Sequence, residues 1–410
     1  MQVRALSLCA ILGALSIAGL SGCQMPPSPP PPVAAIPPPP PPKSAPHQLL
    51  ADEPQFLRLA NMEKAKTPLR VGVILPLTSP SAGTRALAGA MLKAAELALY
   101  DSGRSDIVLM TADDSAAKPQ EAAAAAERLL GQGAEIIIGP LFAASVTAVA
   151  PVARDRGVPV LAFSTDRSVA GDGIYLLSFQ PQSEVKRVIS YAISQGHKNF
   201  AALVPSTSYG QVAEQAFRLE VKEGGGTVAG VEHFSPGAGA VMNQTSAIAK
   251  MNADAVFIPQ GGTLLRAIAP TLAFNGVDSA KVKLLGTGLW DDPAIGREAA
   301  LRDGWFAAPA PDADRSFVSK YRAAFGTAPP QLAALAYDAV SLIALLGGGT
   351  PYHRFTAQAL TDPNGFSGVD GIFRFNADGS IERGLPVLAV RPGGFDTVSP
   401  APATFQGKGS

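Results

Sequence analysis

The clearest candidate for a nucleophile is Ser183-Glu184-Val185-Lys186, where a serine and a lysine stand three positions apart. That spacing suits a serine activated by lysine for acyl transfer, but the Ser-Asp-Asn and Lys-Thr-Gly partners of this chemistry are absent from the sequence. Ser183 also stands where the cap of a predicted helix belongs, a common role for serine. The four histidines are scattered without the spacing of a metal site: His47, His197, His233 and His353. We therefore expect no catalytic centre, no metal site, no cofactor and no enzyme activity.

Cys23 follows an apolar run and precedes a tract rich in proline. The apolar stretch Ala5–Gly19 has the length of an export signal, and Leu20–Cys23 resembles the bacterial lipobox, in which the chain is cut before the cysteine and the thiol is acylated. We therefore expect a signal peptide at 1–22, lipidation at Cys23, and an extended proline-rich tether over 23–68. An ordinary signal peptide with an incidental cysteine is the alternative.

The composition is that of a globular protein, with 47% hydrophobic and 16% charged residues. Lys and Arg total 33, as do Asp and Glu, so the chain offers no overall basic field for nucleic acid. We expect no nucleic-acid partner. The apolar stretch Leu332–Leu346 carries Asp338 at its middle, which favours a buried core helix over a membrane span.

Strand-like apolar runs alternate with helical patterns from Leu69 onward. The run "RVGVILPL" at 70–77 suits a strand buried on both faces, and "PQEAAAAAERLL" at 119–130 suits a helix with proline in its first turn. Such alternation predicts a parallel sheet with helices on both sides. The alternation restarts after 173–181, which indicates two doubly wound units in series. Near the end, Asp-Gly at 378–379 between alternating runs predicts a β-hairpin closing the edge of one unit.

Ligands of open α/β sheets bind beyond the carboxyl ends of the strands. The loops expected there carry hydroxyl, amide, aromatic and carboxyl side chains. The candidate ligand-binding residues are Ser79, Ser145, Ser164 and Thr165 in the first unit and Tyr209, Gln260, Trp290 and Asp291 in the second. Hydroxyls near helix N-termini can hold a carboxylate, and Tyr209 and Trp290 could cover the ligand. Helix capping by the serines and simple packing by the aromatic residues remain the alternatives.

Several stretches, in order along the chain, resemble one known family. They are "RVGVILPLTSPSAG", "IIIGPLFAASVTAVAPVARDRGVPVLAFST", "SYGQVAEQAF", "ALAYDAVSLIALL" and "GVDGIFRFNADGSIERG". Together they are similar to type 1 periplasmic binding proteins of the Leu/Ile/Val-binding group. The resemblance implies an α/β fold of two Rossmann-like lobes that close on a ligand, as in a Venus flytrap. It implies lobe one from 69–180 with 307–348, lobe two from 181–306 with 349–398, and leaves 399–410 as a flexible tail.

Within that group, "LLGTGLWDDP" and "DGWFAAPAPD" look most like the lipoproteins that activate penicillin-binding proteins. Amino-acid-binding members place an acidic residue in lobe two for the ligand's ammonium group. At the corresponding loop, Asp292 precedes a proline and resembles a helix cap, which leaves Asp291 as the candidate acid.

Two functions follow from the resemblance. The first is a lipid-anchored, non-catalytic activator of a peptidoglycan synthase. The alternative is the solute receptor of an amino-acid ABC importer, with a permease as its partner and a small polar ligand such as an amino acid. Both imply the periplasm and a membrane reached through the lipid, and Gln24 after the cysteine implies the outer membrane.

Overall fold

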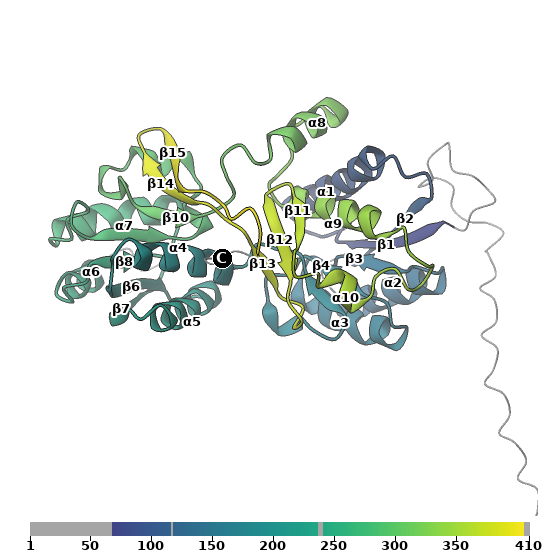
Figure 1. Ribbon diagram of the computed structural model, residues 1–410, viewed down its shortest axis with the longest axis horizontal. Helices are drawn as coiled ribbons and strands as arrows, with labels where there is room; N and C mark the ends of the chain where they lie inside the picture. The colour runs from purple at the N-terminus through teal and green to yellow at the C-terminus, as the bar shows by residue number, and fades with distance from the viewer. Residues whose placement is uncertain (1–67, 116–117, 237–240, 406–410) are drawn as a thin grey trace, which may run out of the picture. The chain divides into compact units, whose positions relative to one another are not determined.

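Two β-sheets with mainly parallel strands form the framework of the protein (Figure 1). The computed structural model describes residues 68–115, 118–236 and 241–405. The predicted signal peptide, Cys23 and all but the last residue of the predicted tether lie outside the described residues. Within the described ranges, no helix is both long and apolar enough to cross a membrane.

The lobe-one sheet has the strand order β2-β1-β3-β4-β5, with every pair parallel. Its strands are β1 (Leu69–Leu75), β2 (Ile107–Asp113), β3 (Ile136–Ile138), β4 (Val160–Ala162) and β5 (Ile174–Leu176). The helices of this lobe are α1 (Ala82–Asp101), α2 (Pro119–Gly131), α3 (Ala143–Asp155), α8 (Arg315–Phe325) and α9 (Ala333–Leu346), with a 3-10 turn η2 (Arg167–Val169). Alternate strand residues point to opposite faces: Val73 joins the core under α1 and α9, whereas Ile74 joins the core under α2 and α3.

The lobe-two sheet repeats this order as β7-β6-β8-β9-β10 and adds two antiparallel strands, β14 and β15, beyond β10. Its strands are β6 (Asn199–Pro205), β7 (Thr227–Phe234), β8 (Ala255–Phe257), β9 (Lys283–Gly286), β10 (Trp305–Ala307), β14 (Val387–Arg391) and β15 (Gly394–Ser399). Its helices are α4 (Pro181–Ser194), α5 (Ser208–Glu223), α6 (Met242–Ala249) and α7 (Gly262–Phe274), with 3-10 turns η3 (Gly288–Trp290), η4 (Pro293–Arg297) and η5 (Ala299–Leu301). Again one core lies under α4 and α5 and another under α6 and α7. The predicted α/β class with two doubly wound lobes is confirmed.

The C-terminal region, from residue 357 onward, contributes strands to both lobes. The short helix α10 (Ala357–Leu360) precedes an antiparallel sheet of β11 (Phe366–Gly368), β12 (Gly371–Phe375) and β13 (Ile381–Arg383). The predicted hairpin at Asp-Gly 378–379 joins β12 to β13. Its tip reaches the edge of the lobe-one sheet, where the Leu176 N–H donates to the Gly379 carbonyl at 2.8 Å.

This region differs from the expected lobe division. Phe373, Phe375 and Ile381 are buried in the lobe-one core, because alternate residues of the β12–β13 hairpin all face that core. The apolar face of the β12–β13 hairpin is therefore buried in lobe one, although β13 also contacts α4 of lobe two through Ser183 and Lys186, and the hairpin β14–β15 joins the lobe-two sheet. Residues 399–405 of the expected flexible tail are packed on the fold instead, since Phe405 is 6% exposed and lies 4.6 Å from the Arg374 guanidinium.

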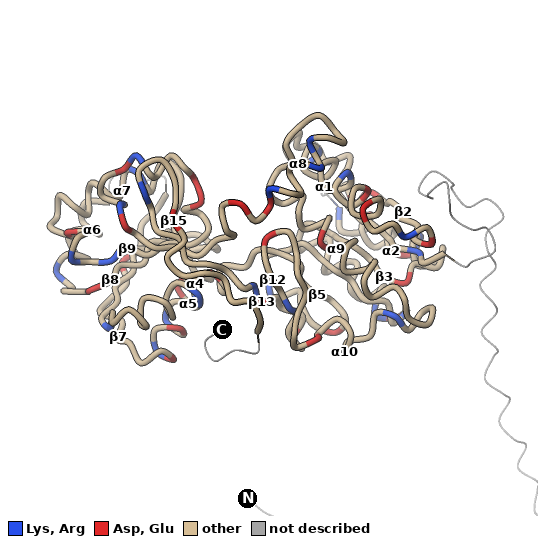
Figure 2. The backbone as a smooth tube through the Cα atoms, turned by 45° about the horizontal axis from the view of Figure 1, so that its top comes forward, with Lys and Arg blue, Asp and Glu red and all other residues tan. Residues whose placement is uncertain are grey.

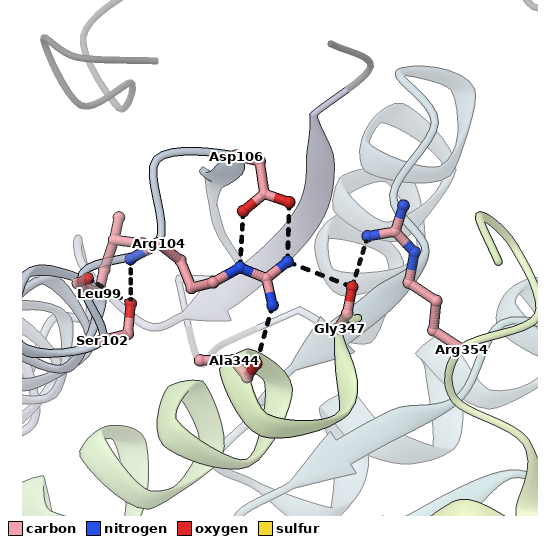
Figure 3. Close-up of polar contacts among 7 residues, drawn as sticks. All are labelled: Leu99, Ser102, Arg104, Asp106, Ala344, Gly347 and Arg354. Carbon is pink, nitrogen blue, oxygen red and sulfur yellow. Dashed lines mark hydrogen bonds and ion pairs between the residues drawn. The ribbon is translucent and has the colours of Figure 1, made fainter. Parts of the chain in front are cut away.

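Arg104 fixes the carboxyl end of α9 (Figure 3). Its Nε and Nη2 donate to the two carboxylate oxygens of Asp106, each at 2.7 Å. Its remaining donors reach the carbonyls of Ala344 at 3.1 Å and Gly347 at 3.2 Å, and Arg354 donates to the same Gly347 carbonyl at 3.0 Å. Carbonyls at a helix C-terminus lack intrahelical partners and favour nearby cations, so this arginine centre holds α9 in place.

Candidate functional site

A crevice of about 210 Å³ lies where the two lobes and their connecting segments meet. Three groups of residues line it: Tyr209, Gly288, Leu289 and Asp291 from lobe two, Gln331 and Leu332 immediately before α9, and Phe179, Pro181, Glu184, Ala308 and Pro309 from the connecting segments and α4. Both lobes therefore contribute to the same small cavity, and its surface mixes apolar side chains with carboxyl groups.

The lobe-two wall is held by hydrogen bonds at the ends of β6 and β9. Tyr209 lies in the first turn of α5, which Thr207 caps by accepting from the Gly210 N–H at 3.1 Å. The Tyr209 hydroxyl donates to Thr287 Oγ1 at 2.8 Å. Burial, with the nearby Glu184 carboxyl, raises the pKa of Tyr209 above its ordinary value. Tyr209 therefore presents a neutral ring and a fixed hydroxyl to the crevice.

Glu184, in the first turn of α4, forms part of the crevice lining. Its Oε2 accepts from the Gly288 backbone N–H at 2.9 Å. A Cβ at Gly288 would lie only 2.9 Å from Glu184 Oε1, so glycine is what permits this approach. Desolvation raises the pKa of Glu184 to about 7, against the lowering effects of that N–H and of Arg383. The carboxyl therefore titrates near neutral pH.

Behind this lining lies a buried charged cluster centred on Arg383 of β13, which is 4% exposed. Its Nε donates to the Ser178 carbonyl at 3.0 Å, and the guanidinium lies 4.5 Å from the centre of the Phe179 ring. The carboxyls that act on its charge are Asp338, Asp370 and Glu184. Its Nη1 and Nη2 have no hydrogen-bond partner among the described residues.

Asp338 and Asp370 approach Arg383 from lobe one. Asp338 is on α9, is 3% exposed, and its Oδ1 accepts from the Val369 N–H at 2.8 Å. Asp370, in the turn between β11 and β12, is 4% exposed. Desolvation raises the pKa of Asp338 to about 7 and that of Asp370 to about 6, and in both cases Arg383 acts in the opposite direction. The Arg383 guanidinium is thus the positive charge shared by three carboxyls, those of Asp338, Asp370 and Glu184.

The structure brings Tyr209 and Asp291 of the predicted site residues into this crevice. The prediction that Trp290 covers a ligand is wrong, because its side chain is 0% exposed and its Nε1 donates to the Ile258 carbonyl at 3.1 Å. The indole packs against Gly286, where a Cβ would come within 2.2 Å of it. Gln260 also lies outside the crevice lining, and its amide donates to the adjacent Gly261 carbonyl at 3.0 Å.

The lobe-one candidates follow β1, β3 and β4, which are neighbours in the sheet, so their loops share one edge. Ser79, Ser145 and Ser164 are buried, whereas Thr165 is exposed. Ser164 Oγ accepts from the Asp166 N–H at 3.1 Å, and Ser79 Oγ accepts from the Ser81 N–H at 3.3 Å. These serines form local turns, and none of the four lines the described crevice. Their contact with a ligand stays a prediction.

Sequence reasoning missed Glu184 and the cluster around Arg383. Glu184 lies within the serine–lysine motif, but a single glutamate in the first turn of a predicted helix gives no local indication of a binding role. Asp338 carried a clearer signal, because a carboxylate in the middle of an apolar helix is costly to bury without a partner. Nothing in the local sequence around Arg383 or Asp370 indicates that these residues meet Asp338.

No group of three or more His, Cys, Asp or Glu side chains in the described part of the chain is arranged to hold a metal ion. The site is therefore a set of carboxyls, one buried guanidinium and apolar walls. Such a surface can bind and orient a small molecule.

Residues 68–394 match the family model described as periplasmic binding protein. The Leu/Ile/Val-binding protein BraC3 of Rhizobium johnstonii is 26% identical over 64% of this chain and 73% of its own length. An uncharacterized protein of Rickettsia prowazekii is 23% identical over 38% of this chain, and the match spans 40% of that protein. The crystal structure of a putative branched-chain amino acid ABC transporter from Rhodospirillum rubrum superposes with a TM-score of 0.72 at 21% identity, covering 81% of this chain and 100% of that one.

Proposed function

The chain belongs to the periplasmic binding protein family, and we propose that it is a solute receptor that captures a small organic molecule in its interlobe crevice and delivers it to the permease of an ABC importer. The amino-acid-type receptor, which was the alternative from sequence, fits the similar proteins better than the activator of a peptidoglycan synthase. The family implies the periplasm.

The observation that carries the proposal is the crevice itself. Its lining comes from lobe two at Tyr209 and Asp291, from lobe one at Gln331 and Leu332, and from the connecting segments. A ligand that touches both lobes would stabilise one arrangement of them, because only that arrangement makes both sets of contacts. The volume of about 210 Å³ lies below the range of typical drug-sized sites, which suits a compact solute.

The proposed role is non-catalytic. The described part of the chain offers carboxyls and hydroxyls for binding, and the serine of the serine–lysine motif is engaged structurally, with Ser183 Oγ donating to the Ile381 carbonyl at 3.3 Å. Lipid attachment at Cys23 completes the proposal. A receptor anchored by this lipid would lie near its permease in the inner membrane, whereas the outer membrane predicted from Gln24 would favour the activator, and membrane fractionation separates these two locations.

A thermal-shift screen against amino acids and small organic acids and amines tests the receptor proposal. A true ligand raises the free energy of unfolding by RT ln(1 + [L]/Kd), and the melting temperature rises with it. Tyr209→Phe, in the crevice lining, should weaken the response at fixed ligand concentration. Tyr191→Phe is the matched control, because Tyr191 lies on α4 and its hydroxyl reaches the Val398 carbonyl instead. A flat response to every solute would contradict the proposal.

The activator remains a second candidate because apolar side chains are exposed at the crevice, namely Leu289 at 45% and Leu332 at 36%. These could dock a protein segment. The resemblance to the activators rests partly on the stretch "LLGTGLWDDP". Trp290 in this stretch is a core residue, so packing alone explains its presence there. Co-purification of a peptidoglycan synthase with the intact lipoprotein, lost in Leu289→Asp, would favour this candidate over the receptor.

A further inference from the structure

A second pocket, of about 380 Å³, lies where α4, the end of β13 and the chain after β15 come together. Residues of α4 between 183 and 190 form one wall, the last two residues of β13 form another, and residues between 399 and 405 form a third. No residue of this lining also lines the interlobe crevice. Small-molecule sites usually measure about 300–1,000 Å³, so the pocket is large enough to hold a ligand of its own.

Basic side chains outnumber acidic ones in this lining. The basic residues are Lys186 and Arg187 of α4 and Arg383 of β13, and the acidic residue is Glu382. Glu382 is already neutralised, because its Oε1 accepts from Lys186 at 2.9 Å and its Oε2 accepts from Arg374 at 2.6 Å. Over the described chain as a whole, basic and acidic residues are interspersed (Figure 2). The pocket is therefore a local positive region that contains two arginines in excess.

Arg187 brings its charge to the pocket without a carboxylate partner. Its Nε donates to the Leu385 carbonyl at 2.7 Å. Its Nη2 donates to Ser399 Oγ at 2.6 Å and to the Pro400 carbonyl at 3.1 Å. All three acceptors are uncharged, and no carboxylate among the described residues forms an ion pair with this guanidinium. These bonds hold the guanidinium at the pocket wall and leave its charge uncompensated.

Arg383 supplies a second, independent observation. Its side chain is 4% exposed and lines the pocket, and its Nη1 and Nη2 have no hydrogen-bond partner among the described residues. The carboxyls that act on its charge accept no hydrogen bond from it. Buried donors left unpaired are costly, and two parallel N–H groups of a guanidinium match the two oxygens of a carboxylate. The unpaired donors of Arg383 therefore indicate an anionic ligand.

We propose that this pocket binds a small organic carboxylate, whose oxygens accept from Arg383 and whose charge is balanced by Arg187. The site is separate from the crevice, and it does not depend on which solute the crevice takes. Leu385, Pro402 and Phe405 give the lining an apolar part, which suits a ligand with a short apolar body. A carboxylate fits better than a phosphate, because a phosphate would bury a second charge and a further oxygen.

A carboxylate in this pocket would contact elements of both lobes. Arg187 lies on α4 of lobe two, whereas Arg383 ends β13, whose residue Ile381 is buried in the lobe-one core. A ligand held by both arginines would stabilise the arrangement of the lobes that makes both contacts. Arg383 also acts on Glu184, which lines the crevice. The occupied pocket would therefore change the charge balance at the crevice, as a regulatory site does.

Calorimetric titration of the intact protein in a low-chloride buffer tests the inference. Phenylacetate, phenylacetamide and phenethylamine share one aromatic body and carry a negative, a neutral and a positive head group. We expect phenylacetate to bind about tenfold more tightly than either of the other two, because only its head group pairs with the arginines. Phenyl phosphate should bind more weakly than phenylacetate. Tighter binding of phenyl phosphate, or equal binding of phenylacetamide, would overturn the carboxylate assignment.

Arg187→Gln should weaken phenylacetate binding about tenfold, because it removes one of the two uncompensated charges. Arg154→Gln is the matched control, since Arg154 lies on α3 and its Nε also donates to a backbone carbonyl, that of Asp172 at 3.1 Å. Ser190→Glu covers the case in which Arg187→Gln does not fold. Ser190 is exposed and lines the pocket, so the added carboxylate should repel the ligand without disturbing the core. Ser194→Glu adds the same charge one turn further along α4, outside the lining.

Weaker phenylacetate binding in Arg187→Gln and Ser190→Glu, with the two controls unchanged, would support the pocket. If Tyr209→Phe weakens phenylacetate binding and the pocket variants do not, the anion is a crevice solute. That result would overturn the second site while the receptor stands. If no anion binds, the second site is overturned as well, and the solute responses that depend on Tyr209 still test the receptor separately.

Discussion

Helix α9 meets one arginine at its carboxyl end and another beside its middle, and the two guanidinium groups differ in how fully they are hydrogen-bonded. Arg104 donates to both oxygens of Asp106 and to two carbonyls at the end of the helix. Arg383 donates through Nε alone, although Asp338 on the same helix acts on its charge.

The difference separates a structural centre from a responsive one. Charge-assisted, bidentate pairs such as Arg104–Asp106 fix geometry, and the Arg104 centre joins elements within one lobe. The Arg383 cluster instead joins α4 of lobe two to α9 and β13 of lobe one. Among the described residues, Nη1 and Nη2 of Arg383 and Oδ2 of both Asp338 and Asp370 have no hydrogen-bond partner. We therefore expect the Arg383 cluster to respond to pH, because burial raises the pKa values of Glu184, Asp338 and Asp370 to about 7, 7 and 6.

The strongest test removes the guanidinium of the responsive cluster. Arg383→Met leaves Asp338, Asp370 and Glu184 without their cation, and removing one partner of a buried ionic group costs about 3–5 kcal/mol. The loss in free energy of unfolding, measured with urea at pH 8, should be clearly smaller at pH 5, where these carboxyls are protonated. An equal loss at both pH values would show that the guanidinium acts mainly by packing.

Arg104→Ala should have a smaller effect with no such pH dependence. The Arg104 side chain is 27% exposed, and loss of its hydrogen bonds to charged and helix-terminal groups should cost about 1–3 kcal/mol. Hydrogen bonding to Arg104 lowers the pKa of Asp106 below its ordinary value, so the pair stays ionised from pH 5 to pH 8. Ligand affinity should be unchanged, and Arg104→Lys should be intermediate. A change in ligand affinity would contradict this expectation and show that the Arg104 centre also influences the ligand site.

The smallest effect expected is on the slope of stability with pH. Burial raises the pKa of Asp338 to about 7 in the folded protein from 3.8. The folded state therefore binds more protons than the unfolded state between these values, and this contribution to stability is full below about pH 4 and is lost as pH rises through about 7. Asp338→Asn should flatten the decline between pH 6 and pH 7 by about 1 kcal/mol. An unchanged slope would assign the titration to Glu184 or Asp370.

Local patterns were sufficient to predict the strands, helices and doubly wound class. The helix expected at 119–130 is Pro119–Gly131, and the hairpin at Asp-Gly 378–379 is where it was expected. Short-range propensity and periodicity determine these features. Which lobe receives the hairpin depends on long-range burial of Phe373 and Phe375, which no local pattern encodes.

The site was harder to predict for the same reason. Tyr209 and Asp291 were found because they follow strands at the sheet edge where ligands bind. Trp290 follows the same strand, but its indole occupies the space that Gly286 leaves in the core, so adjacency in sequence did not imply shared exposure. The Arg383 cluster collects residues separated by up to 199 positions, from Glu184 to Arg383, and only the fold assembles them.

The last strands of the chain have a consequence for biogenesis. The tip of the β12–β13 hairpin reaches β5 at Leu176, and β14 pairs with β10, so one side of each parallel sheet is covered by a segment synthesised after residue 370. Unpaired outer strands invite association between molecules. A nascent chain halted before this point would leave β5 and β10 as unpaired edges, so completing the last strands should lower its tendency to associate with other chains.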